Sequence, residues 1–291
     1  MKYTNKYKLP KSFYRAVVQN TYDLDKLDEK YISATALISP VRQSILKIRH
    51  WNELVEDVSD SGWRLFGEAM HYVVTKANQK DNIVEKRLEY KVDSIIVSGK
   101  PDIYIPTEKT IEDYKITSVW SVIYANHDDW EKQLNIYAFL HRVNGDKIEK
   151  LRVIAFLRDF NQRKALTELN YPESQIVEVP IKLWTLEEQE KYILDRVEKT
   201  LEARRLSDDK LPICTPEERW QTPNLYKVMK KGRKSAVKNF ENKEDAIEFI
   251  NNNKDKKLLS IKFFKGEDRK CLNYCPVKDF CNYYKEVYGN A

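Results

Sequence analysis

The sequence predicts a mixed α/β fold with a central sheet flanked by helices. Apolar residues recur at helical spacing over 61–78, β-rich runs follow over 84–120, and helical and strand patterns then alternate up to residue 206. This order is typical of a layered α/β domain, and it excludes a repeat protein or a helical bundle. Of the 291 residues, 42% are hydrophobic, which is enough to build a core.

Helices are predicted where apolar side chains recur every three or four residues. A short one follows the Ser-Pro pair at 39–40, and a second covers 61–78. The third, over 128–142, has acidic residues in its first turn, and the fourth, over 185–206, opens with a Thr-x-x-Glu capping box. The second helix carries its apolar residues at Trp63, Phe66, Met70, Val73, Val74 and Ala77.

Strands are predicted from β-branched and aromatic runs over 84–92, 94–106, 109–120 and 151–160. Residues 1–30 are polar and are expected to form an irregular N-terminal arm, followed by the α/β core over 31–213. The character changes at Cys214. A hairpin, a short helix and a strand then form a small ββαβ unit at about 222–266, inside a C-terminal region over 214–291.

Several classes of protein are excluded by what the sequence lacks. Glycine is scarce, and no window fits a P-loop or a Rossmann phosphate-binding turn. No apolar run is long enough to span a membrane, so no membrane partner is expected. The first residues lack the apolar segment of a secretory signal, which predicts a cytoplasmic protein. In that compartment the four cysteines are interpreted as thiolates in preference to disulfides.

The positive charge of the chain is concentrated at its C-terminal end. Residues 210–291 contain 18 Lys and Arg against 11 Asp and Glu, whereas the rest of the chain is close to neutral. A basic end on a neutral body indicates a polyanionic partner, and a solvated lysine-rich surface is the alternative interpretation.

Two acidic residues and a lysine form the most informative pattern. Asp102 follows a turn, and Asp113 opens an Asp-Tyr-Lys run on the next predicted strand. Side chains at i and i+2 on a strand share a face, so Asp113 and Lys115 point the same way. Paired strands can bring Asp102 beside Asp113, where two carboxylates favour Mg²⁺ or Mn²⁺. With a lysine to hold the scissile phosphate, this set suits metal-assisted phosphodiester hydrolysis.

Gly99-x-x-Asp102 followed by Asp113-Tyr114-Lys115 resembles the PD-(D/E)xK nuclease superfamily, specifically its RecB-type branch. That branch carries a histidine on a preceding helix and a Gln-x-x-x-Tyr helix afterwards. His71 matches the first feature, and Gln133 and Tyr137 match the second. The resemblance implies that His71, Asp102, Asp113 and the main-chain carbonyl of Tyr114 bind metal, that Lys115 is catalytic, and that Gln133 and Tyr137 contact the substrate.

The four cysteines, Cys214, Cys271, Cys275 and Cys281, all follow the predicted core. Their spacings differ from the C-x₂-C of zinc ribbons, and Cys275 is followed by proline, as iron–sulfur ligands often are. The tail is similar to those of the AddB-type and CRISPR-adaptation nucleases, although its first spacing is three instead of two and Cys214 does not precede the nuclease motifs. The resemblance implies a [4Fe–4S] cluster. Zn²⁺, free thiols or a disulfide remain the alternatives.

Within the ββαβ unit, the hairpin carries basic residues with no acid between Tyr226 and Lys238. A basic hairpin can follow a phosphate backbone, and the flanking Tyr226 and Phe240 can stack on bases. A solvated hairpin is the alternative. The predicted DNA-binding residues are Lys227, Lys230, Lys231, Arg233, Lys234 and Lys238.

The predicted function is metal-dependent DNA hydrolysis, expected to be exonucleolytic, in recombination, repair or phage DNA processing. The substrate would be single-stranded DNA or duplex ends. Because no helicase motor is present in the sequence, a helicase or recombination partner would be a separate protein. The alternatives are a structure-specific endonuclease, an RNA-directed enzyme and a non-catalytic DNA-binding scaffold, and the complete set of Asp102, Asp113 and Lys115 argues against the scaffold.

Overall fold

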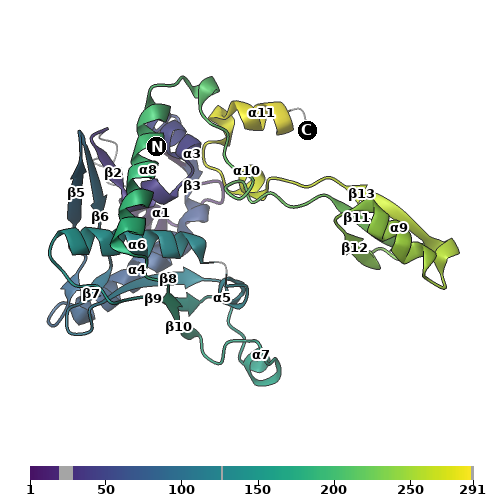
Figure 1. Ribbon diagram of the computed structural model, residues 1–291, viewed down its shortest axis with the longest axis horizontal. Coiled ribbons are helices and arrows are strands. Elements are labelled where there is room, and N and C mark those ends of the chain that lie inside the picture. Colours follow the sequence, from purple (N-terminus) through teal and green to yellow (C-terminus); the bar gives the residue numbers. More distant parts are fainter. Residues whose placement is uncertain (20–28, 126, 290–291) are drawn as a thin grey trace. The chain divides into compact units, whose positions relative to one another are not determined.

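The computed structural model describes residues 1–19, 29–125 and 127–289 (Figure 1). The chain divides into two compact units, Met1–Ser207 and Asp208–Ala291. In the described residues, no helix combines the length and the apolar character that crossing a membrane requires.

The larger unit is built around a five-stranded mixed sheet in the order β10-β9-β8-β7-β4 (Figure 1). β8 runs parallel to β9 and antiparallel to β7, which confirms the predicted mixed sheet. In β9, side chains alternate between buried and less buried, as expected for a strand with one covered face. The strands are β4 (Ile83–Val84), β7 (Ile103–Ile105), β8 (Thr110–Thr117), β9 (Lys150–Leu157) and β10 (Ile176–Ile181).

Two of the predicted strands lie outside this sheet. β5 (Leu88–Val92) and β6 (Ile95–Gly99) join β2 (Tyr31–Ser33) in a separate three-stranded sheet. The chain leaves one sheet at Gly99 and enters the other at Ile103. The expectation of one central sheet is therefore wrong for these strands. The reason is that the short connection through Asp102 changes sheets instead of forming a hairpin.

Helix α6 (Asp128–Val143) packs on strands of both sheets, and α8 (Leu186–Arg204) packs on α6. The capping box of α8 is formed as predicted, because the Thr185 hydroxyl accepts from the Glu188 N–H and the Glu188 carboxylate accepts from the Thr185 N–H. The other α-helices of this unit are α1 (Lys11–Gln19), α2 (Ala34–Ile38), α3 (Val41–Arg49), α4 (Gly62–Asn78), α5 (Val119–Ile123) and α7 (Gln162–Thr167).

The described part of the N-terminal segment is more regular than the predicted arm. β1 (Lys2–Thr4) pairs in parallel with β3 (Val55–Asp57), and α1 follows it. The Asp57 carboxylate accepts from the Thr4 hydroxyl at 2.7 Å and from the Lys6 N–H at 2.8 Å, which holds the strand in place. The pairing depends on residues 53 positions away, so polar composition alone did not indicate it. Residues 20–28 of the predicted arm lie outside the described residues.

The smaller unit contains the predicted ββαβ element. β11 (Leu225–Lys230) is the centre of a three-stranded antiparallel sheet, between β12 (Lys238–Phe240) and β13 (Leu259–Phe264). α9 (Lys243–Asn251) packs on all three strands, and buried Val228 and Ala246 mark the contact side. Two short helices follow, α10 (Arg269–Asn273) and α11 (Asn282–Tyr288).

Candidate active site

The predicted site residues come from four parts of the larger unit. Asp113 and Lys115 lie on β8, His71 lies on α4, and Gln133 lies on α6. Asp102 lies in the connection that changes sheets, directly before β7. Because β8 is the middle strand of the five, residues on it are surrounded from both sides.

Asp102 joins the connection to both α4 and β8. Its Oδ1 atom lies 3.0 Å from the His71 Nδ1 atom, and its Oδ2 atom accepts the Tyr114 backbone N–H at 2.8 Å. The side chain of Asp102 is nearly buried. The hydrogen bond to Asp102 raises the pKa of His71, and burial of the imidazole lowers it to a smaller extent. The predicted approach of Asp102 to the Asp-Tyr-Lys strand is thus present.

Asp113 is a buried carboxylate beside a lysine. The Lys115 Nζ atom lies 2.5 Å from the Asp113 Oδ2 atom, so the two side chains share the face expected from their i, i+2 spacing. This contact is an ion pair without good hydrogen-bond geometry, and the buried oxygen therefore keeps unused acceptor capacity. Burial raises the pKa of Asp113, Lys115 counteracts the shift, and the negative charge of Asp102 adds to it.

Helix α6 continues this set of contacts. The Lys115 Nζ atom donates to the Gln133 Oε1 atom at 3.0 Å, and the Gln133 Nε2 atom donates to the Tyr137 hydroxyl at 3.0 Å. Gln133 and Tyr137 are four residues apart, which puts them on one face of the helix. Burial raises the pKa of Tyr137 far above its ordinary value, so this hydroxyl keeps its proton at physiological pH.

The contact between α6 and the sheets requires a glycine at residue 99. A Cβ atom on Gly99 would lie 2.6 Å from the Leu140 Cδ1 atom and 2.9 Å from the Tyr137 Cδ1 atom. The glycine of the Gly-x-x-Asp motif thus lets the Tyr137 and Leu140 side chains of α6 pack directly against the end of β6. Its role follows from packing between segments 38 residues apart.

The opposite face of β8 has a support that the sequence analysis missed. The Tyr114 hydroxyl donates to the Glu112 Oε2 atom at 2.6 Å, and the Arg152 Nε atom donates to the Glu112 Oε1 atom at 2.6 Å. Glu112 is nearly buried, so the arginine balances its charge. The available signal was a charged residue at 152 inside an otherwise apolar strand run.

No preformed metal centre accompanies these contacts. Among the residues that the structure describes, no three or more His, Cys, Asp or Glu side chains are grouped so that they could hold a metal ion. The fit of a cation therefore rests on the donor chemistry at Asp102 and Asp113. Two neighbouring carboxylates, one of them with an unsatisfied buried oxygen, are suitable ligands for a hard divalent cation.

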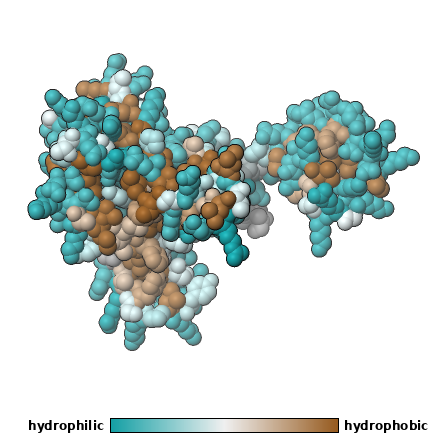
Figure 2. All heavy atoms as spheres, turned by 90° about the horizontal axis from the view of Figure 1, so that it is seen from below, coloured by the Kyte–Doolittle hydropathy of each residue, from teal (hydrophilic) through white to brown (hydrophobic). Residues whose placement is uncertain are grey.

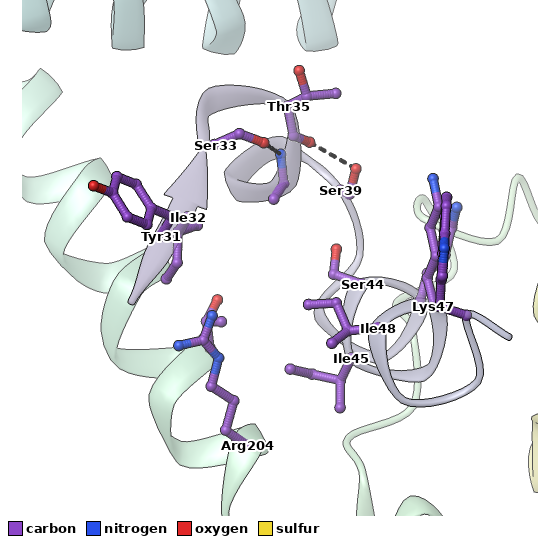
Figure 3. Close-up of a pocket in the computed structure, with 14 residues that line it drawn as sticks. Tyr31, Ile32, Ser33, Thr35, Ser39, Ser44, Ile45, Lys47, Ile48 and Arg204 are labelled. Atoms are coloured by element: carbon purple, nitrogen blue, oxygen red, sulfur yellow. Dashed lines mark hydrogen bonds between the residues drawn. The ribbon is translucent and has the colours of Figure 1, made fainter. Parts of the chain in front are cut away.

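The main cavity described in the larger unit lies elsewhere. It has a volume of about 160 Å³ and is lined by residues of β2, α2, α3 and the end of α8 (Figure 3). Hydroxyl groups such as those of Ser33 and Ser44 line it together with the Arg204 side chain. Neither the carboxylates nor His71 or Lys115 contribute to the lining of this cavity.

The four cysteines belong to the smaller unit and are thiols, not halves of disulfide bonds. Burial raises the pKa of Cys214 to about 12, and the other three cysteines and Glu218 contribute to the shift. Burial and the nearby Cys275 raise the pKa of Cys271 to about 11. Since these thiols influence one another, Cys214 lies near the other three in space, although it is far from them in sequence. Like the carboxylates, they do not form a preformed metal-ligand group in the described residues.

A buried ion pair lies beside the cysteines. The Arg219 Nε atom lies 3.1 Å from the Asp268 Oδ1 atom, and an Arg219 guanidinium N–H donates to the main-chain carbonyl of Cys214. The Tyr283 hydroxyl donates to the Asp268 Oδ2 atom at 2.7 Å. These contacts connect the segment around Cys214 with the segments on both sides of the other three cysteines.

Several of the predicted DNA-binding lysines have contacts inside the ββαβ element. Lys230 forms an ion pair with Asp255, and the Lys238 Nζ atom lies over the rings of Phe240 and Phe249. Tyr226 packs against Phe263 with ring centroids 5.1 Å apart. The hairpin side chains Lys231, Arg233 and Lys234 are exposed. Hydrophilic side chains cover most of the visible surface of this element (Figure 2).

The face of the small sheet opposite α9 carries two cations that face each other. Lys227 on β11 is directly paired with Lys262 on β13. Their Nζ atoms lie 4.1 Å and 5.2 Å from the centroid of the Phe264 ring. Lys227, Lys234 and Phe264 also line a hollow of about 460 Å³. The sequence analysis missed Lys262, because only the β11–β13 register shows that it lies opposite Lys227.

No protein-family model matches this chain, and no curated protein matches it. Several solved structures are similar at low identity, including the following three. The protein SSO0001 has 15% identity and a TM-score of 0.46, over 65% of this chain and 83% of its own. A phage-related exonuclease from Haemophilus somnus 129PT has 13% identity and a TM-score of 0.38, over 60% and 94%. An alkaline exonuclease (LHK-Exo) from Laribacter hongkongensis has 9% identity and a TM-score of 0.37, over 66% and 93%.

Proposed function

We propose that this chain is a metal-dependent deoxyribonuclease that hydrolyses phosphodiester bonds, with exonucleolytic cleavage as the expected mode. The observation that carries the proposal is the set of contacts around β8. It includes two carboxylates, a histidine and a lysine, and it continues through Gln133 to Tyr137. A purely structural role does not account for two acids and a lysine gathered at one point of a sheet, because burying them costs free energy.

A divalent cation fits the acidic part of this arrangement. Burial and the negative charge of Asp102 raise the pKa of Asp113, so a positive charge between the two carboxylates would stabilise the ionised form of Asp113. The proposed ligands are His71, Asp102, Asp113 and the main-chain carbonyl of Tyr114, and the proposed ion is Mg²⁺ or Mn²⁺. When bound, such an ion would neutralise charge on the scissile phosphate and act as a Lewis acid toward it.

The other side chains would position the substrate. Lys115 has a contact on each side, with Asp113 and with Gln133, so its ammonium group is held at a fixed place beside the carboxylates. There it could attract a non-bridging phosphate oxygen. Gln133 would hold Lys115, and the protonated Tyr137 hydroxyl would hold Gln133.

We also propose that the small sheet binds the phosphate backbone of DNA. Like charges directly opposite each other across two strands destabilise a sheet, so the pairing of Lys227 with Lys262 is better explained by an anion that they share. The exposed Lys231, Arg233 and Lys234 on the hairpin would extend the contact. Because two ammonium groups lie over the Phe264 ring, this face suits phosphate groups better than stacked bases.

For the cysteines we propose a [4Fe–4S] cluster held by Cys214, Cys271, Cys275 and Cys281, with Zn²⁺ as the alternative. The support is chemical: four neighbouring thiols without a histidine partner suit a soft metal. With pKa values raised to about 12 for Cys214 and about 11 for Cys271, these two thiols hold their protons at neutral pH when no metal is bound. Metal binding must displace these protons, so we expect it to weaken as the pH falls.

The proposal is tested by incubating the purified chain with linear and circular DNA, single-stranded and duplex, in the presence of Mg²⁺ or Mn²⁺. We expect cleavage that requires the metal, stops with a chelator and spares covalently closed circles. Cleavage of closed circles would show that the enzyme is an endonuclease and not an exonuclease. If the protein cleaved RNA but not DNA, the proposed substrate would be wrong. Failure of the protein to cleave any of these substrates with either metal would contradict the enzymatic proposal.

A further inference from the structure

Helix α4 carries an apolar stripe on its solvent side. Trp63 is 55% exposed, and Phe66 and Val73 are each 64% exposed. The rings of Trp63 and Phe66 touch, with centroids 5.8 Å apart. Exposed apolar side chains that form a continuous row, unlike single ones, mark an interaction surface. We call this row the α4 stripe; its members are Trp63, Phe66, Met70, Val73 and Ala77.

The spacing of the α4 stripe specifies the kind of partner. Its members follow one another by three, four, three and four residues, which is the a/d repeat of a coiled coil. The stripe thus keeps one face toward a second helix along more than three turns. Within the described residues, α4 packs mainly on β4, β8 and η2 (Val58–Ser61). The Arg64 side chain also donates to the Val17 carbonyl of α1, and the Arg158 guanidinium lies 5.2 Å from the centroid of the Trp63 ring at one end of the stripe. Buried Thr75 marks that covered side of the helix.

We propose that two copies of this chain associate through the α4 stripe, with the two α4 helices antiparallel. In an antiparallel pair, a positions of one helix face d positions of the other. The register then sets Trp63 against Val73 and Phe66 against Met70, so each large ring meets a smaller side chain. A parallel pair would set Trp63 against Trp63 and Ala77 against Ala77, which overfills one end and leaves a void at the other.

The residues beside the stripe favour the same arrangement. Gly67 and Ala69 flank the point where the two-fold axis would pass, and their small size lets the helix backbones approach. Lys76 is the charged residue in the flanking positions. In the antiparallel register the two copies of Lys76 lie about 24 Å apart along the helix axes, at 1.5 Å per residue. A parallel pair would place them side by side.

The size of the α4 stripe indicates a reversible dimer. Two aromatic rings that are more than half exposed offer roughly 200 Å² in each copy, given the 150–250 Å² of such a side chain. This is less than the roughly 800 Å² per partner of a standard interface, so we expect dissociation in the micromolar range. The inference does not depend on nuclease activity, and its tests do not measure cleavage.

The first test is the mass of the full chain in solution, measured by light scattering from about 1 to 100 µM, a range that spans the expected dissociation constant. We expect a rise from the monomer mass of 34.6 kDa toward twice that value. Phe66→Arg should weaken dimerisation at least about tenfold, because it puts a charge in the stripe. Tyr72→Arg is the control. Tyr72 is as exposed as Phe66 but lies off the stripe, so its variant should dimerise like the wild type.

The second test examines the register and does not need Phe66→Arg to fold. Ala69 is exposed and lies beside the proposed two-fold axis, so Ala69→Cys should form a disulfide between two copies under mild oxidation. Tyr72→Cys should not. A protein that stays monomeric throughout, or an equal dimer with Phe66→Arg, would overturn the proposal. It would also be overturned if Phe66→Arg, folded by circular dichroism, lost binding to a single-stranded oligonucleotide while the wild type remained monomeric. The stripe would then be a DNA surface.

Discussion

Asp113 and Lys115 share one strand face, and we propose different roles for them. We expect Asp113→Ala and Lys115→Ala each to lower cleavage at least about 100-fold, the scale of losing a positioned charge in an active site. Asp113→Ala should also weaken Mn²⁺ binding, because it removes an anionic ligand. Lys115→Ala should leave Mn²⁺ binding largely intact, since an ammonium group is not a ligand. Calorimetric titration of Mn²⁺ separates the two effects.

The matched control for this pair is Lys109→Ala. Lys109 is also a lysine paired with an acid, at 2.5 Å from the Glu149 Oε1 atom, but it is half-buried and lies next to the start of β8, away from Asp113. Its variant should cleave and bind Mn²⁺ like the wild type. Wild-type cleavage by either folded β8 variant would place the active site elsewhere.

Gly99 gives a second prediction at the scale of one residue. An added Cβ atom would meet Leu140 and Tyr137 at less than 3.0 Å, so Gly99→Ala should destabilise the protein by about 1–3 kcal/mol, the cost of overpacking. It should also lower cleavage, because Tyr137 holds Gln133. Gly62→Ala is the control, since a Cβ atom there meets nothing within 4 Å. Urea denaturation of both variants measures the difference, and equal stability would show that α6 can shift without cost.

At the scale of elements, substitutions in the small sheet can distinguish a role in DNA binding from a role in stability. Changing Lys227 and Lys262 together to glutamine should weaken DNA binding and reduce the salt slope of log K by about 0.9 per lost contact on duplex DNA, or about 0.7 on a single strand. The same change should leave stability equal or higher, because it removes a pair of like charges. Filter binding across salt concentrations and thermal unfolding measure the two outcomes.

The control for the sheet is the pair Lys256 and Lys257, which are also lysines of the smaller unit but lie in a short helical turn outside the strands. Their change to glutamine removes the same formal charge. If both double variants lose equal affinity, the binding follows net charge and not the Lys227–Lys262 face.

At the scale of the whole molecule, the two units should respond differently to loss of a cysteine. Cys275→Ala should destabilise the smaller unit by about 4 kcal/mol if the cluster acts as a cross-link that closes the loop from Cys214 to Cys271. The core carrying Asp102 and Asp113 should stay folded, because it belongs to the other unit. Limited proteolysis and two-step thermal unfolding report on each unit separately.

The colour of anaerobically purified protein and its iron and zinc content identify the bound metal. A [4Fe–4S] cluster gives a brown protein with absorption near 400 nm and about four irons per chain, and Cys275→Ala should be colourless. A colourless wild type with one zinc per chain would replace the cluster with a Cys₄ zinc site. A wild type without either metal would contradict the proposed metal-bound region.

The sequence by itself determined the features that depend on neighbours along the chain. The i, i+2 relation of Asp113 and Lys115, the i, i+4 relation of Gln133 and Tyr137, the capping box of α8 and the ββαβ order all follow from strand and helix periodicity. Periodicity is a local property, so it can be read without knowing the fold.

Only the tertiary structure decided which distant segments meet. It separated β5 and β6 from the main sheet, set Asp102 against the Tyr114 N–H, paired Lys262 with Lys227, and left the apolar stripe of α4 exposed. These outcomes depend on sheet register and on close approaches such as that of Gly99 to Tyr137. They arise from packing among many segments at once, and a linear pattern of residues does not contain that information.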